Sequence, residues 1–115
     1  MILLDTHALI WYLTQPEKMS KAGTRAADAG FAGQGVGIVD ITLWEIAMLM
    51  QKKRVILEAS PAQFLHLYLQ SRNVRVMPIT PEIAELATSL GAGLSNDPAD
   101  RLIAATAIIN NARVV

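Results

Sequence analysis

Three carboxylates stand out because of where each falls in the hydrophobic pattern. Asp5 directly follows the apolar run 2–4, Glu45 is the only charged residue in the apolar segment 41–50, and Asp100 precedes the largely apolar run 102–109. A buried carboxylate without a partner costs on the order of several kcal/mol. No lysine or arginine adjoins Glu45 in the sequence, so a bound cation would supply the missing partner.

Oxygen ligands of this kind favour hard divalent cations. Mg²⁺ binds carboxylates, keeps several waters and usually completes its shell with a substrate phosphate, and Mn²⁺ accepts the same ligands. Zinc is disfavoured because the chain has no cysteine and only two histidines, His7 and His66. His66 falls inside a helical pattern and is expected to be structural. His7 lies two residues past Asp5, where contact with the site and a local hydrogen bond are equally good interpretations.

Short apolar segments alternate with helical patterns along the chain. We predict strands over 2–4, 36–39, 74–79 and 113–115. Helices are predicted over 7–13, 20–30, 42–53, 60–72, 80–91 and 97–111. This alternation implies right-handed crossovers and a parallel sheet covered on both faces. The predicted fold class is therefore α/β, a three-layer α/β/α sandwich, and residues 1–115 suffice for a single domain.

This topology brings the three acids to one edge of the sheet. All strands of a parallel sheet end at the same edge, the crossover helices begin there, and ligands bind there. Asp5 follows the first strand, whereas Glu45 and Asp100 lie near the starts of two predicted helices. We therefore expect the three carboxylates to share one rim of the molecule.

Helix capping is the structural alternative. Thr42 and Glu45 have the spacing of a capping box, and segment 97–100 resembles one with Pro98 at its first helical position. Capping therefore explains Glu45 or Asp100 taken singly. On the sequence, it does not explain Asp5, nor does it require three carboxylates on one edge.

Composition and charge restrict the remaining possibilities. Ten basic and ten acidic residues cancel, so net charge does not indicate nucleic acid. The only basic run, Lys52-Lys53-Arg54, is either a weak RNA-binding patch or a solvated helix end. No apolar run approaches the ~18 residues of a membrane span, the start is a poor signal peptide, and a cytoplasmic protein without disulfides is expected. The glycines at 33, 35 and 37 precede a strand and lack a Gly-Lys-Ser/Thr sequence, so we interpret them as a turn and linker, not a phosphate loop.

Four segments together resemble a known family. MILLDTHALIW (1–11), ITLWEIA (41–47), PITPEIA (78–84) and NDPADRLIAATA (96–107) resemble, from end to end and in order, the PIN domains of VapC toxins. The resemblance implies an Mg²⁺- or Mn²⁺-dependent endoribonuclease that leaves 5′-phosphate and 3′-hydroxyl ends. It implies the toxin of a toxin–antitoxin pair, neutralised by a small VapB-type antitoxin, homodimeric, and cutting structured RNA such as tRNA or rRNA.

The resemblance also assigns residues. Three of them match the metal-binding acids of the family: Asp5, Glu45 and Asp100. Thr6 matches a small hydroxyl residue that would orient a water or phosphate. Asp97 is an extra acid, which we interpret first as a helix N-cap and then as support for the site. Arg101 is expected either to contact RNA or to pair with a carboxylate.

One departure bears on activity. The family's fourth strand is usually followed by a Thr-x-Asp or Thr-x-Asn segment, whereas this sequence ends on that strand at Val115. We therefore expect a domain that lacks the C-terminal end of the family fold, with weaker metal binding and activity. The alternative function is a degenerate, non-catalytic PIN domain that binds RNA or a protein.

Overall fold

Four parallel strands form the centre of the molecule. The computed structural model describes residues 1–55, 57–70, 74–91, 93 and 95–115. Its sheet has the strand order β3-β2-β1-β4. The strands are β1 (Ile2–Leu3), β2 (Val36–Val39), β3 (Val74–Met77) and β4 (Arg113–Val114). Ile2 lies opposite Val36 on one side and Arg113 on the other, and every pairing is parallel. All four predicted strands are confirmed, although β3 ends before Ile79.

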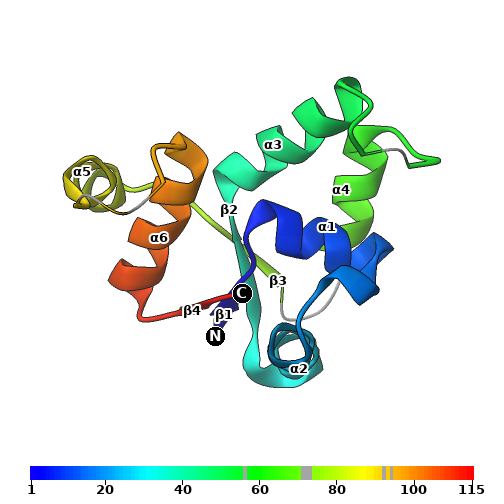
Figure 1. The fold of residues 1–115 in the computed structure, drawn as a ribbon, viewed down its shortest axis with the longest axis horizontal. Coiled ribbons are helices and arrows are strands. Elements are labelled where there is room, and N and C mark those ends of the chain that lie inside the picture. Colours follow the sequence, from blue (N-terminus) through cyan, green and yellow to red (C-terminus); the bar gives the residue numbers. More distant parts are fainter. Residues whose placement is uncertain (56, 71–73, 92, 94) are drawn as a thin grey trace.

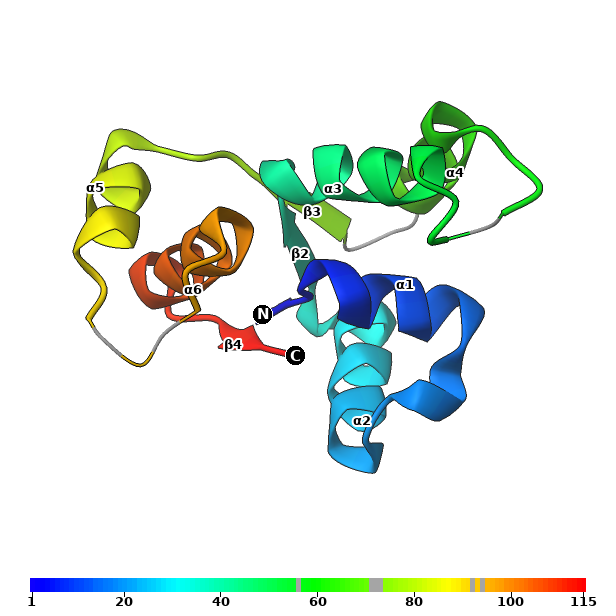
Figure 2. The same cartoon turned by 45° about the horizontal axis from the view of Figure 1, so that its top comes forward.

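Helices cover both faces of this sheet. On one face lie α1 (Thr6–Thr14), α2 (Lys21–Ala29), α3 (Asp40–Gln51) and α4 (Pro61–Leu69), as Figures 1 and 2 show. On the other face lie α5 (Pro81–Ser89) and α6 (Pro98–Asn110). The predicted three-layer α/β/α architecture is confirmed. The predicted end of the fourth helix at Arg72 lies outside the described residues.

Alternation along β1 creates two cores, because successive side chains of a strand point to opposite faces. Ile2 and Leu4 are buried in the larger cluster with Leu9 of α1. Leu3, between them, is buried in the smaller cluster with Ile103 of α6. The short first strand is therefore anchored from both sides, and Asp5, two residues after its end, has a fixed position at the edge of the sheet.

Side-chain caps set most helix starts where the sequence predicted them. Ser20, Thr80 and Asp97 each accept a backbone N–H of the first turn of their helix. Ser60 and Gln63 form a complete capping box at the start of α4. Such caps satisfy backbone donors that have no partner within the helix, so these boundaries could be predicted from local sequence.

The start of α3 differs from the prediction. The helix begins at Asp40, directly after β2, and its N-cap residue Val39 has no side-chain cap. Thr42 lies inside the helix and is fully buried, so the predicted capping box with Glu45 is not formed. An acidic residue in the first turn is favoured by the helix dipole, and Asp40 supplies it.

The glycine-rich segment before β2 is a tight turn. Residues Gly30–Gln34 form a π-helical turn, and Gly35 enters the strand with φ +97°. A Cβ on Gly30 would lie only 2.7 Å from a methyl group of Val36, so the close approach requires glycine. The predicted turn is confirmed for Gly33 and Gly35, whereas Gly37 lies inside β2. None of the helices in the described residues is both long and apolar enough to cross a bilayer.

Candidate functional site

Helices α1, α3 and α6, which carry the three predicted acids or follow them directly, begin at the carboxyl ends of the strands (Figure 1). Asp5 is the N-cap residue of α1, Asp100 is in the first turn of α6, and Glu45 is in the second turn of α3. The right-handed topology therefore places them on one rim, although they come from three separate parts of the sequence.

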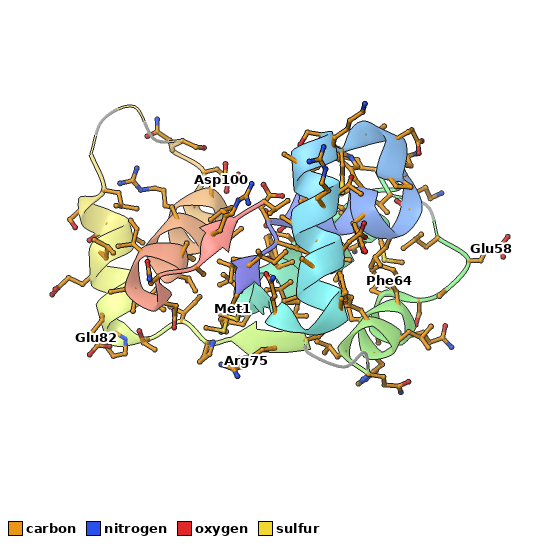
Figure 3. The ribbon with its side chains drawn as sticks, turned by 90° about the horizontal axis from the view of Figure 1, so that it is seen from below. Met1, Glu58, Phe64, Arg75, Glu82 and Asp100 are labelled. Carbon is orange, nitrogen blue, oxygen red and sulfur yellow. The ribbon has the colours of Figure 1, made fainter. Side chains whose placement is uncertain are left out.

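Asp5 and Asp100 line the same pocket. Its volume is about 420 Å³, and it lies between the start of α1, the segment that leads into α2, and the start of α6. Figure 3 shows the Asp100 side chain at the beginning of α6, well separated from Met1 at the start of β1. The other side chains that contribute to the wall include His7, Trp11 and Lys18.

Glu45 adjoins this acidic group and is half-buried. Burial raises the pKa of its carboxyl, and the negative charges of Asp97 and Asp100 raise it further. A hydrogen bond from the Thr6 hydroxyl and the nearby His7 oppose this rise. Glu45 therefore lies in the electrostatic field of two carboxylates at the start of α6, Asp97 and Asp100.

Thr6 connects two helices at the site. Its buried hydroxyl donates to Oε1 of Glu45 and is hydrogen-bonded to the Thr42 hydroxyl at 3.2 Å. Thr6 belongs to α1, whereas Thr42 and Glu45 belong to α3. The hydroxyl thus holds the Glu45 side chain against the start of α1. The water- or phosphate-orienting role that the resemblance implies for Thr6 stays a prediction.

Capping accounts for Asp5 and Asp97 but not for Glu45 or Asp100. Asp5 Oδ1 accepts the backbone N–H of Ala8 at 2.7 Å, so our expectation that capping would not explain Asp5 is wrong. Asp97 caps α6, as predicted, accepting from the N–H groups of Ala99 and Asp100. Within the described chain, Asp5 Oδ2 and both oxygens of Asp100 accept no hydrogen bond.

The carboxylate oxygens at the site are suitable ligands for a divalent cation, but the side chains are not arranged to hold one. No lysine or arginine of the described residues pairs with Asp5, Glu45 or Asp100, so the cluster carries uncompensated negative charge. However, among residues that the structure describes, no three of His, Asp and Glu lie close enough together to hold one ion. The predicted coordination sphere is therefore not formed by the side chains as they lie, and the metal assignment stays a prediction.

Arg101 is engaged elsewhere. Its guanidinium donates to the backbone carbonyls of Ala87 (2.9 Å), Leu90 and Ser95 (3.3 Å). These carbonyls belong to the end of α5 and to the connection that leads into α6. Among the residues that the structure describes, Arg101 therefore pairs with no carboxylate, and three of its five N–H donors are used by backbone acceptors. The RNA contact predicted for Arg101 stays untested.

The basic run lies at the far end of α3. Lys52, Lys53 and Arg54 are exposed and follow the last turn of the helix. Lys52 is seven residues from Glu45, which corresponds to about 10 Å along an α-helix. Lys53 and Arg54 line a groove that faces the end of α1. The run is separate from the acidic pocket, and its role in RNA binding stays a prediction.

The structure agrees with the structural role predicted for His66, and it favours one of the two interpretations of His7. His66 is exposed on α4, away from the pocket. His7 is exposed and lines the pocket, and it makes no hydrogen bond within the described residues. Contact with the site is therefore the interpretation of His7 that the structure supports.

Sequence reasoning missed a fourth carboxylate at this edge. Asp40 follows β2 as Asp5 follows β1, and its Oδ2 accepts the Ile79 N–H at 3.2 Å. Its Oδ1 is buried without a partner among the described residues. The rule that selected Asp5, an acid directly after an apolar strand, would have found Asp40 as well. The residue was overlooked because the helix was predicted to start at Thr42.

The architecture and the position of the acids are typical of one class of domain. A parallel α/β/α sandwich with acidic residues gathered at the carboxyl ends of its strands is a domain of the kind that binds ligands at that edge. The family model described as "PIN domain" matches residues 2–115. This chain therefore belongs to the PIN-domain family, and the resemblance in the sequence is confirmed.

Relatives narrow the family further. The chain is 32% identical to "Ribonuclease VapC22" of Mycobacterium tuberculosis (strain ATCC 25618 / H37Rv), over 99% of this chain and 84% of that protein. This likeness places the chain in the VapC group.

Solved structures show the same fold. "VapBC2 from Rickettsia felis bound to a DNA fragment from their promoter" has a TM-score of 0.71 at 18% identity, covering 99% of this chain and 85% of that one. "Toxin-antitoxin complex from Klebsiella pneumoniae" has a TM-score of 0.66 at 20% identity, covering 99% and 83%. "FitAcB from Neisseria gonorrhoeae" has 0.64 at 23%, covering 99% and 85%. At these identities the likeness establishes the fold alone.

Proposed function

We propose that this VapC-group PIN domain is a divalent-metal-dependent endoribonuclease. One observation carries the proposal: Asp5 and Asp100 line a single pocket, and Glu45 lies within electrostatic reach of Asp100. No lysine or arginine of the described residues forms an ion pair with these acids. Uncompensated carboxylates beside a pocket are the ligands that Mg²⁺ or Mn²⁺ takes when it binds phosphate substrates. The similarity to a protein named as a ribonuclease supports the same assignment.

The residues divide into ligands and supports. Asp100 and the free Oδ2 of Asp5 would hold the cation, with Glu45 as the third carboxylate. The bound cation would lower the pKa of a water and neutralise charge on the phosphate during in-line attack. Thr6 holds Glu45 in place, and Asp97 caps the helix turn that carries Asp100. Thr6 thus fixes a side chain, and Asp97 a backbone turn, that the proposed chemistry needs.

Cleavage of RNA by the purified protein tests the activity. We expect total RNA and a labelled RNA hairpin to be cut in Mg²⁺ and to stay intact with chelator. Asp5→Asn and Asp100→Asn should each abolish cutting, and Glu82→Gln, on the exposed face of α5, is the matched control. The new ends should carry 5′-phosphate and 3′-hydroxyl groups. Cleavage by Asp5→Asn at the wild-type rate would discard the site assignment.

The second candidate is a non-catalytic module that binds RNA or a protein. Within the described residues, no three acids or histidines form a ready coordination group, and this observation favours it. Titration calorimetry with Mn²⁺ separates the two functions. A nuclease should take up Mn²⁺ with a stoichiometry that Asp100→Asn reduces, whereas a pure binder should show no uptake that depends on Asp100.

We also propose the partners that the family implies: an RNA substrate such as tRNA or rRNA, a small VapB-type antitoxin that blocks the pocket, and a second copy of this chain. Two of the solved structures named above are toxin–antitoxin or VapBC assemblies, which supports the antitoxin. The test is size-exclusion chromatography with light scattering, alone and with the product of the neighbouring gene. A dimer that the second protein binds and inhibits is expected. A monomer that the neighbour leaves fully active would contradict both assignments.

A further inference from the structure

The acidic pocket has an aromatic wall. His7 and Trp11 lie four residues apart on α1, so they share one face of the helix. Their ring centroids are 5.9 Å apart at an interplanar angle of 58°. Both residues line the pocket that contains Asp5 and Asp100. The wall is therefore next to the carboxylates that the proposed chemistry uses.

The indole of Trp11 is held in place while part of it faces the pocket. Trp11 is half-buried and packs against the larger core cluster, whereas His7 beside it is exposed. Core packing explains the buried side of Trp11, but it does not explain an exposed imidazole against the other side. A fixed aromatic surface offers contact area to a ligand at low entropic cost.

A free cation completes the pocket. Lys18 ends the 3₁₀ turn Pro16–Lys18, is exposed, and lines the same pocket. Within the described chain it pairs with neither carboxylate. The pocket thus presents a cationic group, an aromatic surface and two acids. Its volume of about 420 Å³ is within the range of small-ligand sites, roughly 300–1,000 Å³. With the proposed divalent cation held by the two acids, a flat, anionic ligand of nucleotide size would match this combination.

We propose that this pocket is a subsite for an unpaired nucleobase of single-stranded RNA, stacked on Trp11, with an adjoining phosphate at Lys18. The inference rests on the proposed nuclease function and deepens it by naming the feature of the substrate that is recognised. Bases in loops and single strands expose their faces to aromatic side chains, whereas a duplex conceals them. Stacking tolerates every base, so the subsite selects unpaired RNA and not a particular sequence.

Binding of a labelled single-stranded RNA decamer tests the protein side. Fluorescence anisotropy is measured in Ca²⁺, with gels to show that the RNA stays intact. Trp11→Leu keeps an apolar side chain for the core but removes the aromatic face, and it should weaken binding roughly ten-fold. Trp11→Phe should recover most of the affinity. Trp44→Leu is the matched control, because Trp44 is 61% exposed on α3 and does not line the pocket.

Replacing Lys18 tests the proposed phosphate contact independently of the stacking on Trp11. Lys18→Gln should reduce the dependence of log K on log salt by about one, as expected when one phosphate contact is lost. An unchanged salt dependence would overturn the phosphate contact. Thermal unfolding of every variant shows whether the domain is still folded.

Abasic substitution, one nucleotide at a time, tests the ligand side. One abasic position should weaken binding to the wild type and have no further effect on Trp11→Leu. If the losses of binding free energy caused by the abasic nucleotide and by Trp11→Leu were additive, the stacking assignment would be overturned. A Trp11→Leu variant that binds RNA normally but no longer binds the antitoxin would overturn it as well. If the wild type cuts no RNA but the effects of the abasic nucleotide and Trp11→Leu on binding are still non-additive, the nuclease function fails and the subsite stands. If RNA is cut and Trp11→Leu binds and cuts like the wild type, the subsite fails alone.

Discussion

At the scale of single residues, two polar side chains lose contact with water without full compensation from hydrogen bonds or opposite charges. Glu45 is half-buried, and the acids of α6 lie nearby. Tyr68 is buried in the larger core, and its hydroxyl has no partner among the described residues. Burial raises the pKa of both groups. Groups of this kind reduce stability, but only Glu45 lies where a function would explain the cost.

Replacing Glu45 should change how stability depends on pH. Its pKa is higher in the folded chain than the ordinary 4.5, so its contribution to stability is full below pH 4.5 and is lost as the pH rises through the raised value. Glu45→Gln keeps an oxygen to accept from Thr6 but cannot ionise. In chelator, the variant should therefore gain more in Tm over the wild type at pH 7 than at pH 4. An equal difference at both pH values, as expected of the exposed control Glu82→Gln, would contradict this assignment.

Replacing Tyr68 should stabilise the domain. Tyr68→Phe removes an unsatisfied buried hydroxyl while it keeps the edge-on contact with Phe31. We expect a gain of about 1 kcal/mol, or roughly 4 °C in Tm. Tyr12→Phe is the matched control, because the Tyr12 hydroxyl donates to Asp28 at 2.6 Å, and this change should not stabilise. A lower Tm for Tyr68→Phe would indicate that its hydroxyl has a partner in solution.

At the scale of elements, the hydrogen bonds of two side chains hold the helices that carry the acids. The Thr6 hydroxyl joins α1 to α3. Arg101 joins the first turn of α6 to the last turn of α5 through backbone carbonyls. A cation at a helix C-terminus also interacts favourably with the helix dipole. Arg101 therefore determines how the turn that bears Asp100 sits against its neighbour.

Removing this connection should loosen the α5–α6 layer. Arg101→Met loses charged hydrogen bonds to Ala87, Leu90 and Ser95, and we expect the free energy of unfolding to fall by about 2 kcal/mol. Denaturant unfolding measures the loss, and hydrogen exchange should show faster opening of the first turn of α6. The exposed Arg25→Met is the control. Unchanged stability with weaker RNA binding would instead support the RNA contact predicted from the sequence.

At the scale of the whole molecule, the sheet separates two unequal layers. The larger core lies between the sheet and helices α1 to α4, and the smaller one lies between the sheet and α6 (Figure 2). Asp5 and Glu45 belong to the first layer and Asp100 to the second. A ligand bound by all three would therefore bridge both layers and stabilise the entire domain.

Divalent cations should raise the unfolding temperature. A cation that binds only the folded chain adds about 2.7 kcal/mol at one hundred times its dissociation constant, which corresponds to several degrees in Tm. We expect Mn²⁺ to raise the Tm of the wild type and to leave that of Asp100→Asn unchanged, in thermal scans with and without chelator. An equal increase in both proteins would place the cation elsewhere on the chain.

The order and kind of the elements, and the edge of the sheet on which the acids lie, could be predicted from the residues alone. Strand alternation, caps such as Ser60, and the handedness of parallel crossovers act locally or by general rule, so they can be read from residues 1–115 without coordinates. The placement of Asp5 and Asp100 at helix starts was predicted in this way, whereas Glu45 lies one turn further into α3 than predicted.

The hydrogen-bond partners and neighbours of those residues could not be predicted from the sequence, because they depend on how the layers pack. The hydrogen bonds from Thr6 to Glu45 and from Arg101 to three backbone carbonyls join residues between 6 and 39 positions apart. The start of α3 at Asp40 likewise differs from the start predicted at Thr42. Trp11 and Lys18 likewise meet Asp100 only when α6 folds back against the sheet. Such contacts depend on how layers pack in space, and no local propensity or spacing encodes that packing.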